Sequence, residues 1–358
     1  MSASIGRIAV FGGGGFIGSH LTRRLLANGY HLDVVDISSE KIGDVLGHDR
    51  LQFHELDIYE PENDAACAAI VERSDLVVDL IAYANPEQYV AMPLEVVDLN
   101  LFQNLKIVED CIEAETRLIQ FSTCEVYGML GNRTGDDTVF DEDTSNLIMG
   151  PVGNQRWIYA TAKQLLERMV YAHGERDGLD WTIVRPFNFI GPEMDYIIES
   201  PDEGTPRVFA SFMSALMYDH PMFLVDGGKN MRTFTHIEDA IDALELIIEN
   251  EGGRYTREVV NIGTPGNETT IRGFADLMRD IYREESPDGR LPPMREVDGE
   301  EYYGEGYEDC DRRIPGVDKL REAGWTPRYD LRATLENAMR YYIDKYELER
   351  APSPALSD

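Results

Sequence analysis

A tyrosine and a lysine four positions apart are the first candidates for chemistry, in the segment Tyr159-Ala-Thr-Ala-Lys163. The pattern from Tyr159 to Gly178 predicts a helix, and residues i and i+4 lie on one face of a helix. A cation held near a phenol favours the phenolate and lowers its pKa. Tyr159 is therefore predicted to take a proton from a substrate alcohol while a hydride leaves for a nicotinamide.

A glycine-rich turn predicts the site for that nicotinamide. Gly12-Gly-Gly-Gly15-Phe-Ile-Gly18 lies between a predicted strand and a predicted helix, where glycines let the backbone approach a pyrophosphate. Asp36 ends the next strand, and a carboxylate there holds ribose hydroxyls and repels a 2′-phosphate, so NAD is favoured over NADP. Asp57 and Ile58 follow the third strand. They either contact the adenine of the cofactor or form a solvated turn. The expected cofactor contacts are Gly12, Gly15, Phe16, Ile17, Gly18, Asp36, Asp57, Ile58 and Lys163.

Alternating strand and helix patterns position these motifs. Strands are predicted over Arg7–Phe11, His31–Asp36, Leu51–Leu56, Leu76–Ile81, Arg117–Ser122 and Trp181–Arg185. Helices are predicted over Ile17–Asn28, Val96–Ala114 and Tyr159–Gly178. This alternation implies right-handed βαβ units, so the predicted fold class is α/β, a Rossmann doubly wound parallel sheet. Residues 1–190 are expected to form the NAD-binding domain.

A smaller C-terminal α/β substrate lobe is expected over residues 191–349. Its helices are predicted over Val208–Tyr218, Ile237–Asn250, Ile271–Glu284 and Leu331–Tyr346, with loops at 199–206 and 286–293. Segments near 225–263 are expected to return to the first domain, and residues 350–358 to form a polar tail. We expect the ligands between the lobe and the carboxyl ends of the strands, at the topological switch point.

The chain is strongly acidic, with 33 Lys+Arg against 66 Asp+Glu and a formal net charge of −33. Such a surface repels phosphates, so we expect neither nucleic acid nor anionic membrane as a partner. No apolar stretch has the length of a membrane span or a signal peptide, which predicts a cytoplasmic protein. The four cysteines lack metal-ligand spacing, so no metal is expected. The acidity indicates either adaptation to a salty cytoplasm or GC-rich codon usage.

Further segments carry a family resemblance over almost the whole chain. They are Ser122-Thr-Cys-Glu-Val-Tyr-Gly128, Arg185-Pro-Phe-Asn188, Gly191-Pro192, Asp226-Gly-Gly228, Arg232-Thr-Phe-Thr-His-Ile-Glu-Asp239 and Asn261-Ile-Gly263. With the glycine turn and the Tyr/Lys pair, they resemble the extended short-chain dehydrogenase/reductases, the NAD-dependent sugar epimerases and dehydratases. The resemblance implies a nucleotide-sugar substrate, whose C4 hydroxyl is oxidised by Tyr159 with Thr123 assisting. It also implies a homodimer formed through the helices of residues 96–114 and 159–178.

The triplet Thr123-Cys124-Glu125 narrows the subfamily. Sugar 4,6-dehydratases carry Thr-Asp-Glu here, so the acid for water loss is missing and dehydration is disfavoured. Glu125 is more typical of UDP-glucuronate decarboxylases. Residues 122–128 with 155–159, and residues 302–315, resemble plant UDP-apiose/UDP-xylose synthases and, less closely, the decarboxylase domain of the bacterial aminoarabinose lipid A pathway. The resemblance implies C4 oxidation of UDP-glucuronate and loss of C6 as CO2, giving UDP-xylose, a UDP-4-keto-pentose or UDP-apiose.

The same resemblance implies roles for individual residues. Arg313 and Glu125 form the decarboxylation pair, and Arg156 either binds the substrate carboxylate or makes an ordinary salt bridge. Cys124 matches a cysteine linked to ring contraction, although a buried cysteine is more often a filler. Ala84 stands where the plant enzymes carry a second cysteine. The resemblance therefore supports ring contraction less strongly than it supports decarboxylation. The expected catalytic residues are Tyr159, Lys163, Thr123, Cys124, Glu125 and Arg313. The expected substrate contacts are Tyr89, Arg156, Asn188, Arg207, Arg232, Tyr307 and Arg313, with Arg207 and Arg232 on the UDP phosphates.

Two alternatives remain open. A UDP-glucuronate 4-epimerase, or another NAD-dependent nucleotide-sugar epimerase, would use the same C4 chemistry and suppress decarboxylation. A non-catalytic NAD-binding sensor would retain the fold and lose the catalytic groups. The intact Tyr159/Lys163 pair, together with Thr123 and Glu125, favours an enzyme.

Overall fold

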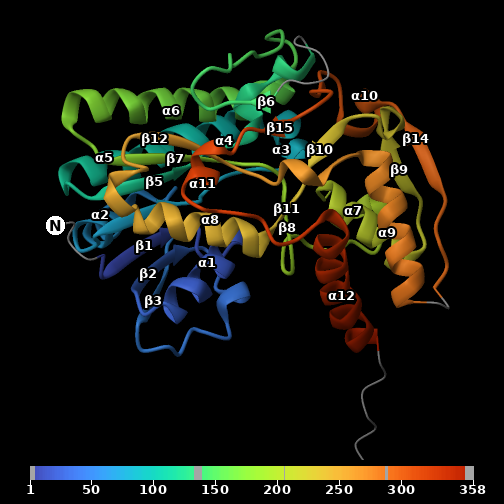
Figure 1. The fold of residues 1–358 in the computed structure, drawn as a ribbon, viewed down its shortest axis with the longest axis horizontal. Coiled ribbons are helices and arrows are strands. Elements are labelled where there is room, and N and C mark those ends of the chain that lie inside the picture. Colours follow the sequence, from blue (N-terminus) through green and yellow to red (C-terminus); the bar gives the residue numbers. More distant parts are fainter. Residues whose placement is uncertain (1–4, 133–138, 205, 287–288, 351–358) are drawn as a thin grey trace, which may run out of the picture.

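A seven-stranded parallel sheet forms the centre of the molecule (Figure 1), seen here in a computed structural model that describes residues 5–132, 139–204, 206–286 and 289–350. The strand order is β12-β7-β5-β4-β1-β2-β3. The strands are β1 (Arg7–Phe11), β2 (His31–Asp36), β3 (Leu51–Glu55), β4 (Leu76–Asp79), β5 (Arg117–Phe121), β7 (Trp181–Pro186) and β12 (Glu258–Ile262). The order reverses direction at β1, so the prediction of a doubly wound Rossmann sheet is confirmed.

Burial on both faces explains why these segments are strands. All four residues of β4 are buried, as are the last four of β1, which is typical of parallel strands covered by helices on both sides. Phe11 at the end of β1 pairs with Val35 of β2 and with Asp79 of β4. The carboxyl ends of these three strands are therefore level, and the loops that follow them meet at one edge.

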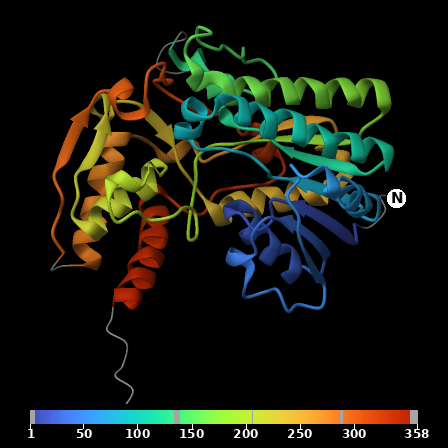
Figure 2. The ribbon, with the colours of Figure 1, turned by 180° about the vertical axis from the view of Figure 1, so that it is seen from behind.

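Helices cover the two faces of the sheet (Figures 1 and 2). One face carries α2 (Asp64–Glu72), α5 (Asn104–Glu113) and α6 (Ile158–Asp177), and the other carries α1 (Phe16–Ala27) and α8 (Ile237–Glu249). Helix α8 lies within residues 225–263, the stretch expected to return to the first domain, and it packs against α1. Arg24 of α1 fixes this contact, because its guanidinium donates to Asp242 at 2.6 Å and to Glu238 at 2.9 Å.

The single helix predicted over Val96–Ala114 is interrupted. It consists of α4 (Pro93–Val97), a π-helical turn (Asp98–Gln103) and α5. Two side-chain amides bind carbonyls within this stretch: Asn100 Nδ2 donates to Val96 O at 2.8 Å, and Asn104 Nδ2 donates to Leu99 O at 2.9 Å. These bonds compete with the regular helical ladder, and such bulges are frequent at functional sites.

The C-terminal lobe stands beside the sheet, at the right of Figure 1. It contains α7 (Val208–Tyr218), β9 (Met222–Val225), α9 (Ile271–Glu285), β14 (Met294–Val297), α10 (Gly299–Tyr303) and α12 (Leu331–Arg350). Helix α12 extends one residue into the expected tail, and residues 351–358 lie outside the described part. Shorter elements are α3 (Pro86–Ala91), β6 (Val139–Phe140), β8 (Phe189–Ile190), β10 (Met231–Thr233), β11 (Thr235–His236), β13 (Glu268–Thr270), β15 (Ile314–Pro315) and α11 (Asp318–Glu322).

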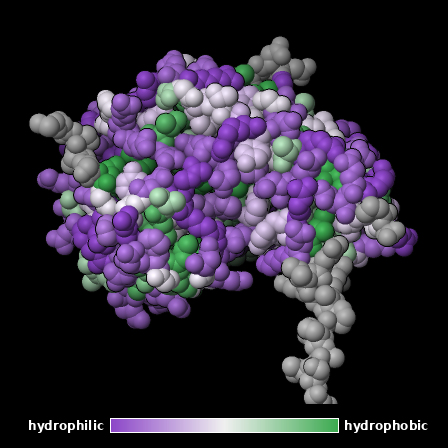
Figure 3. Space-filling view, turned by 60° about the horizontal axis from the view of Figure 1, so that its bottom comes forward, coloured by the Kyte–Doolittle hydropathy of each residue, from purple (hydrophilic) through white to green (hydrophobic). Residues whose placement is uncertain are grey.

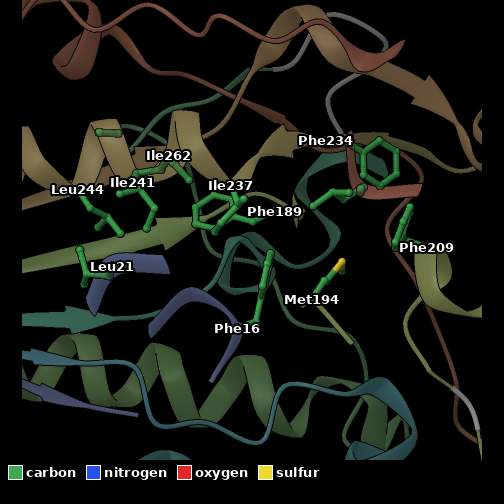
Figure 4. Packing of buried hydrophobic residues seen from close by; sticks show 14 of the residues in the cluster. Phe16, Leu21, Phe189, Met194, Phe209, Phe234, Ile237, Ile241, Leu244 and Ile262 are labelled. Atoms are coloured by element: carbon green, nitrogen blue, oxygen red, sulfur yellow. The ribbon is translucent and has the colours of Figure 1, made fainter. Parts of the chain in front are cut away.

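One hydrophobic cluster joins the lobe to the sheet. It runs from Leu21 and Phe16 of α1 through Phe189 and Ile237 to Phe209 of α7 (Figure 4). The outer face shown in Figure 3 is largely hydrophilic, with scattered hydrophobic residues. Among the described residues, no helix combines the length and the apolar character needed to cross a membrane. The continuous core holds the lobe over the carboxyl ends of the strands.

Candidate active site

A cavity of about 310 Å³ lies where the lobe covers the carboxyl ends of the strands. Its lining comes from α1, from the loops after β4 and β5, from the start of α6 and from the lobe. Many of the residues singled out by sequence line it: Phe16, Ile17, Tyr89, Thr123, Cys124, Glu125, Arg156, Tyr159, Asn188, Arg207, Arg232, Tyr307 and Arg313. The fold thus brings together residues that are up to about 300 positions apart.

The glycine turn after β1 has a shape that suits a dinucleotide pyrophosphate. Gly12 has a φ of +79°, and a Cβ at Gly18 would lie 2.2 Å from Gly12 O, so the turn packs directly under the first turn of α1. Helix α1 begins at this turn with no side-chain cap, and Phe16 and Ile17 border the cavity. Backbone N–H groups at a helix N-terminus bind anions well. The residues present therefore fit the cofactor expected from the sequence.

Asp36 lies against the same turn. Its Oδ2 accepts a hydrogen bond from Gly14 N at 2.9 Å, and its Oδ1 accepts one from Ser38 N at 3.2 Å. Burial raises the pKa of the carboxyl, while these backbone donors oppose the shift. The carboxylate is positioned as expected for a group that receives ribose hydroxyls.

Asp57 and Ile58 follow β3, away from the cavity lining. Ile58 packs in the core on the α2 and α5 side of the sheet. Asp57 Oδ1 accepts from Tyr59 N at 2.9 Å, and the Asp57 carbonyl accepts from Asn63 Nδ2 at 2.9 Å. Their contact with an adenine stays a prediction.

Tyr159 stands at the start of α6 with its ring stacked on Tyr89, at a centroid distance of 4.6 Å and an interplanar angle of 12°. Thr123 caps the short 3-10 helix Cys124–Tyr127 by accepting from Glu125 N at 3.2 Å. Burial raises the pKa of Tyr159, the charge of Glu125 adds to this, and a hydrogen bond with Thr123 opposes it. The phenol is therefore a protonated group that faces the cavity.

Lys163 differs from the expectation in its orientation. Its Nζ donates to Phe121 O at 3.1 Å and to Asn104 Oδ1 at 3.2 Å, and it does not border the cavity. Burial lowers the pKa of Lys163 to about 8. The expected lowering of the Tyr159 pKa by this ammonium is not found, because the ammonium points to the end of β5 and to α5.

A cluster of buried charges lies beside Tyr159. Arg156 makes a bidentate pair with Glu125, including Nη2 to Oε1 at 2.8 Å, and its guanidinium lies 5.1 Å from the centre of the Tyr89 ring. Arg313 Nη1 reaches the same Glu125 Oε1 at 3.4 Å. Burial opposes the ionisation of Glu125, but the two arginines outweigh burial and lower its pKa. Arg156 thus pairs with a residue of the site and not with the acidic surface.

Sequence reasoning missed Asp309, the second carboxylate of this cluster. Its Oδ1 accepts from Arg313 Nη2 at 3.1 Å, and its Oδ2 pairs with Arg232 and lies 3.4 Å from the Tyr307 hydroxyl. Burial opposes its ionisation, and the arginines lower its pKa nonetheless. Asp309 could have been found from the sequence, because it lies four residues before Arg313 within residues 302–315, the segment that resembles the plant synthases.

The remaining predicted substrate contacts, Arg207, Asn188 and Tyr307, also line the cavity, and each interacts with other residues of the protein. Arg207 donates to Asp195 Oδ2 at 3.1 Å and to Met194 O at 3.0 Å. Asn188 has a φ of +42° and donates to Thr233 O at 2.9 Å, and the Tyr307 ring stacks on Tyr303. Substrate contacts through these groups stay predictions.

Cys124 and Ala84 border the same cavity. Burial raises the pKa of the Cys124 thiol to about 11, so it is neutral at pH 7. All four cysteines of the chain are free and buried. In the described part of the chain, no group of three or more His, Cys, Asp and Glu side chains is arranged to hold a metal ion.

Comparison with known proteins agrees with the family resemblance of the sequence motifs. The model of the NAD dependent epimerase/dehydratase family matches residues 8–263. The UDP-D-apiose/UDP-D-xylose synthase of Oryza sativa subsp. japonica is 41% identical over 95% of this chain and 90% of its own length. UDP-D-apiose/UDP-D-xylose synthase 1 of Arabidopsis thaliana is 42% identical, over 95% of this chain and 92% of its own length.

Solved structures agree in fold. The PbgP3 protein of Burkholderia pseudomallei superposes with a TM-score of 0.83 at 33% identity, covering 97% of this chain and 99% of its own. UDP-glucose 4-epimerase of Thermotoga maritima, solved with UDP-glucose, gives a TM-score of 0.75 at 25% identity, covering 95% and 99%.

Proposed function

Because this chain belongs to the NAD-dependent epimerase/dehydratase family, we propose that it is a UDP-glucuronate decarboxylase. The family assignment confirms the predictions of an enzyme and of NAD as its cofactor. The curated relatives are synthases of the UDP sugars UDP-D-apiose and UDP-D-xylose, as their names state, and they match nearly the full chain. The residues around the cavity support the choice of reaction.

The charge of the buried cluster carries this proposal. Three guanidinium groups, of Arg156, Arg232 and Arg313, surround two carboxylates, of Glu125 and Asp309, so the cluster holds one positive charge in excess (3 − 2 = 1). Excess charge in a buried site is costly unless it is paired. A carboxylate of the substrate would neutralise it, and UDP-glucuronate has one at C6.

Oxidation at C4 begins at the tyrosine. Tyr159, stacked on Tyr89 and bonded to Thr123, would receive the proton of the C4 hydroxyl as the phenolate, after its own proton has left. The positive charge of oxidised NAD, when bound, would favour that ionisation. NAD, when bound, supplies the acceptor and later the donor of the hydride. The glycine turn would hold its pyrophosphate, and Asp36 would hold its ribose hydroxyls.

Decarboxylation then needs only the keto group and the charged cluster. The C5–C6 bond breaks, CO2 leaves, and the bonding electrons pass to the C4 ketone as an enolate. Arg313, 3% exposed and bonded to both carboxylates of the cluster, is placed to stabilise that negative charge. A proton returned to C5 completes the UDP-4-keto-pentose, which reduction at C4 converts to UDP-xylose.

Turnover of UDP-glucuronate tests the proposal. The protein is incubated with UDP-glucuronate and NAD in high KCl, and the nucleotide sugars are analysed by mass spectrometry and NMR. We expect loss of one CO2, with the NMR spectrum distinguishing xylose, keto-pentose and apiose. Arg313→Lys should abolish this loss, while the neighbouring control Arg312→Lys, outside the cavity lining and paired with Glu268, should retain it.

Other outcomes contradict the proposal in distinct ways. An unchanged mass with inversion at C4 would make the protein a 4-epimerase and remove the roles given to Glu125 and Arg313. No turnover by a folded protein that binds NAD would indicate a different nucleotide sugar or a sensor.

A homodimer is part of the proposal, supported by exposed apolar side chains on neighbouring helices. Leu94 of α4 is 78% exposed, Phe102 of the π-helical turn 58%, and Leu165 and Tyr171 of α6 46% and 57%. Exposed apolar groups on adjacent elements mark association surfaces. Light scattering should give twice the chain mass, and Phe102→Glu with Leu165→Glu should give the monomer. A wild-type monomer would refute this.

We also propose a cytoplasmic location, supported by the four free, buried cysteines. Thiols persist in reducing compartments, whereas exported proteins tend to oxidise them. Fractionation of the source cells should recover the protein with the cytoplasm, and recovery from an exported fraction would refute the assignment.

A further inference from the structure

Lys163 lies behind the cavity, in a place that solvent does not reach. Its side chain is 1% exposed, and its Nζ donates to Phe121 O and to Asn104 Oδ1. Both acceptors are uncharged. Burial without a nearby negative charge drives an ammonium to release its proton, so its charged state depends on a counter-charge in the surroundings.

Asp79, the last residue of β4, lies at the other end of the same hydrogen-bond network. Its side chain is fully buried, and its Oδ2 accepts from Gln120 Nε2 at 2.8 Å. The same Nε2 lies 3.4 Å from Asn104 Oδ1, the atom that also receives the Lys163 ammonium. Gln120 and Asn104, both fully buried, therefore bridge the carboxylate to the ammonium.

The other ionisable groups around Lys163 are neutral or already paired. Glu167, one turn later on α6, is held by Arg185 of β7 through bonds of 2.9 and 2.7 Å. Tyr159, one turn earlier, is protonated. Cys111 of α5 faces Asp79, and burial raises the pKa of its thiol, so it is neutral. Asp79 differs from Glu167 because its oxygens accept from uncharged donors, Gln120 and the backbone of Ile81. Burial raises the pKa of the Asp79 carboxyl, while the charge of Lys163 and these two hydrogen bonds oppose that increase.

We propose that Asp79 is a positioning residue that keeps the Lys163 ammonium protonated through the Gln120–Asn104 bridge. Burial lowers the pKa of Lys163 to about 8, and the charge of Asp79 opposes that decrease. Loss of the carboxylate would therefore leave a larger fraction of Lys163 neutral around pH 7. The consequence for turnover rests on the proposed function, whereas the ionisation of Lys163 does not.

Titration of the lysines by NMR tests this in the protein without substrate or cofactor. The chain has only six lysines, at positions 41, 106, 163, 229, 319 and 345, so [13Cε]lysine labelling gives few signals, and Lys163→Arg assigns the one in question. In Asp79→Asn, we expect the midpoint of Lys163 to fall by about one pH unit. The control Asp110→Asn removes a half-buried carboxylate of α5 outside this network and should leave that midpoint unchanged.

A second neutral variant, Asp79→Ser, serves if Asp79→Asn does not fold. An unchanged Lys163 midpoint in a folded variant would overturn the proposal. In the active enzyme, Asp79→Asn should move the lysine-dependent limb of the kcat profile to lower pH by the same amount. Absence of decarboxylation in the wild type would refute the proposed function and leave the titration result standing.

Discussion

Replacing Glu125 by glutamine tests whether the buried cluster depends on the charge of its central carboxylate. Glu125 receives two hydrogen bonds from Arg156 and a longer one from Arg313, and its side chain is 13% exposed. A hydrogen bond to a charged group contributes about 1 kcal/mol more than one between neutral groups. The loss over these contacts is roughly 2–3 kcal/mol, and removing one partner of a buried ion pair, which leaves arginine charge uncompensated, typically costs about 3–5 kcal/mol in total. Glu125→Gln should therefore lower the free energy of unfolding by roughly 3 kcal/mol.

Urea unfolding of the protein without ligands measures this change. Glu268→Gln is the matched control, because Glu268 also receives two bonds from an arginine, Arg312, at 2.7 and 2.8 Å. That pair is more exposed and lies outside the cavity lining, so its loss should cost about 1 kcal/mol or less. Equal stability of Glu125→Gln and wild type would refute the argument, since the carboxylate would then give no net stabilisation.

The pH dependence gives a second test of the same charge. Burial raises the pKa of Glu125, but the arginines outweigh it and lower the pKa below the unfolded value of about 4.3. Its stabilisation is therefore complete above the unfolded pKa and is lost as the pH falls through the folded pKa. The difference between wild type and Glu125→Gln should be full at pH 7 and narrow below about pH 4. A difference that stays constant to pH 3 would contradict the assignment of the shift to this residue.

Three further predictions concern the catalytic base, the cofactor and the surface. Tyr159→Phe should lower kcat by about 10²–10⁴-fold with little change in the unfolding midpoint; a smaller loss in steady-state kinetics would mean that another group takes the proton. Asp36→Ala should reduce the preference for NAD over NADP in binding titrations by about tenfold or more, because the 2′-phosphate is no longer repelled; unchanged selectivity would place the discrimination elsewhere. The net charge of −33 predicts that the unfolding temperature rises with KCl, since salt screens the repulsion. A flat dependence would favour codon usage as the origin of the acidity.

Local patterns in the sequence were sufficient for six of the seven strands of the sheet and for the cofactor turn, whereas the edge strand β12 was not predicted. Runs of apolar residues buried on both faces define the parallel strands, and β2 and α7 have the predicted bounds. The glycine turn between β1 and α1, and the i, i+4 spacing of Tyr159 and Lys163, are also local. Such features follow from backbone geometry within a few residues, which is why a single chain reveals them.

Other features depended on contacts between distant segments. Glu125 and Arg313 are 188 positions apart and meet only because the lobe covers the end of the sheet. Asp309 pairs with Arg232, 77 positions away, and no periodicity in the chain indicates that pair. The orientation of Lys163 likewise depends on Asn104, which the π-helical turn places beside β5.

The sequence by itself therefore determined the fold class, the cofactor turn and five of the six charged residues that line the cavity. Tertiary structure alone decided which charges neutralise one another and which are left over. The physical reason is that the ionisation of a buried group depends on burial and on partners within a few ångström. Those partners come from different elements, and only their packing sets the distances.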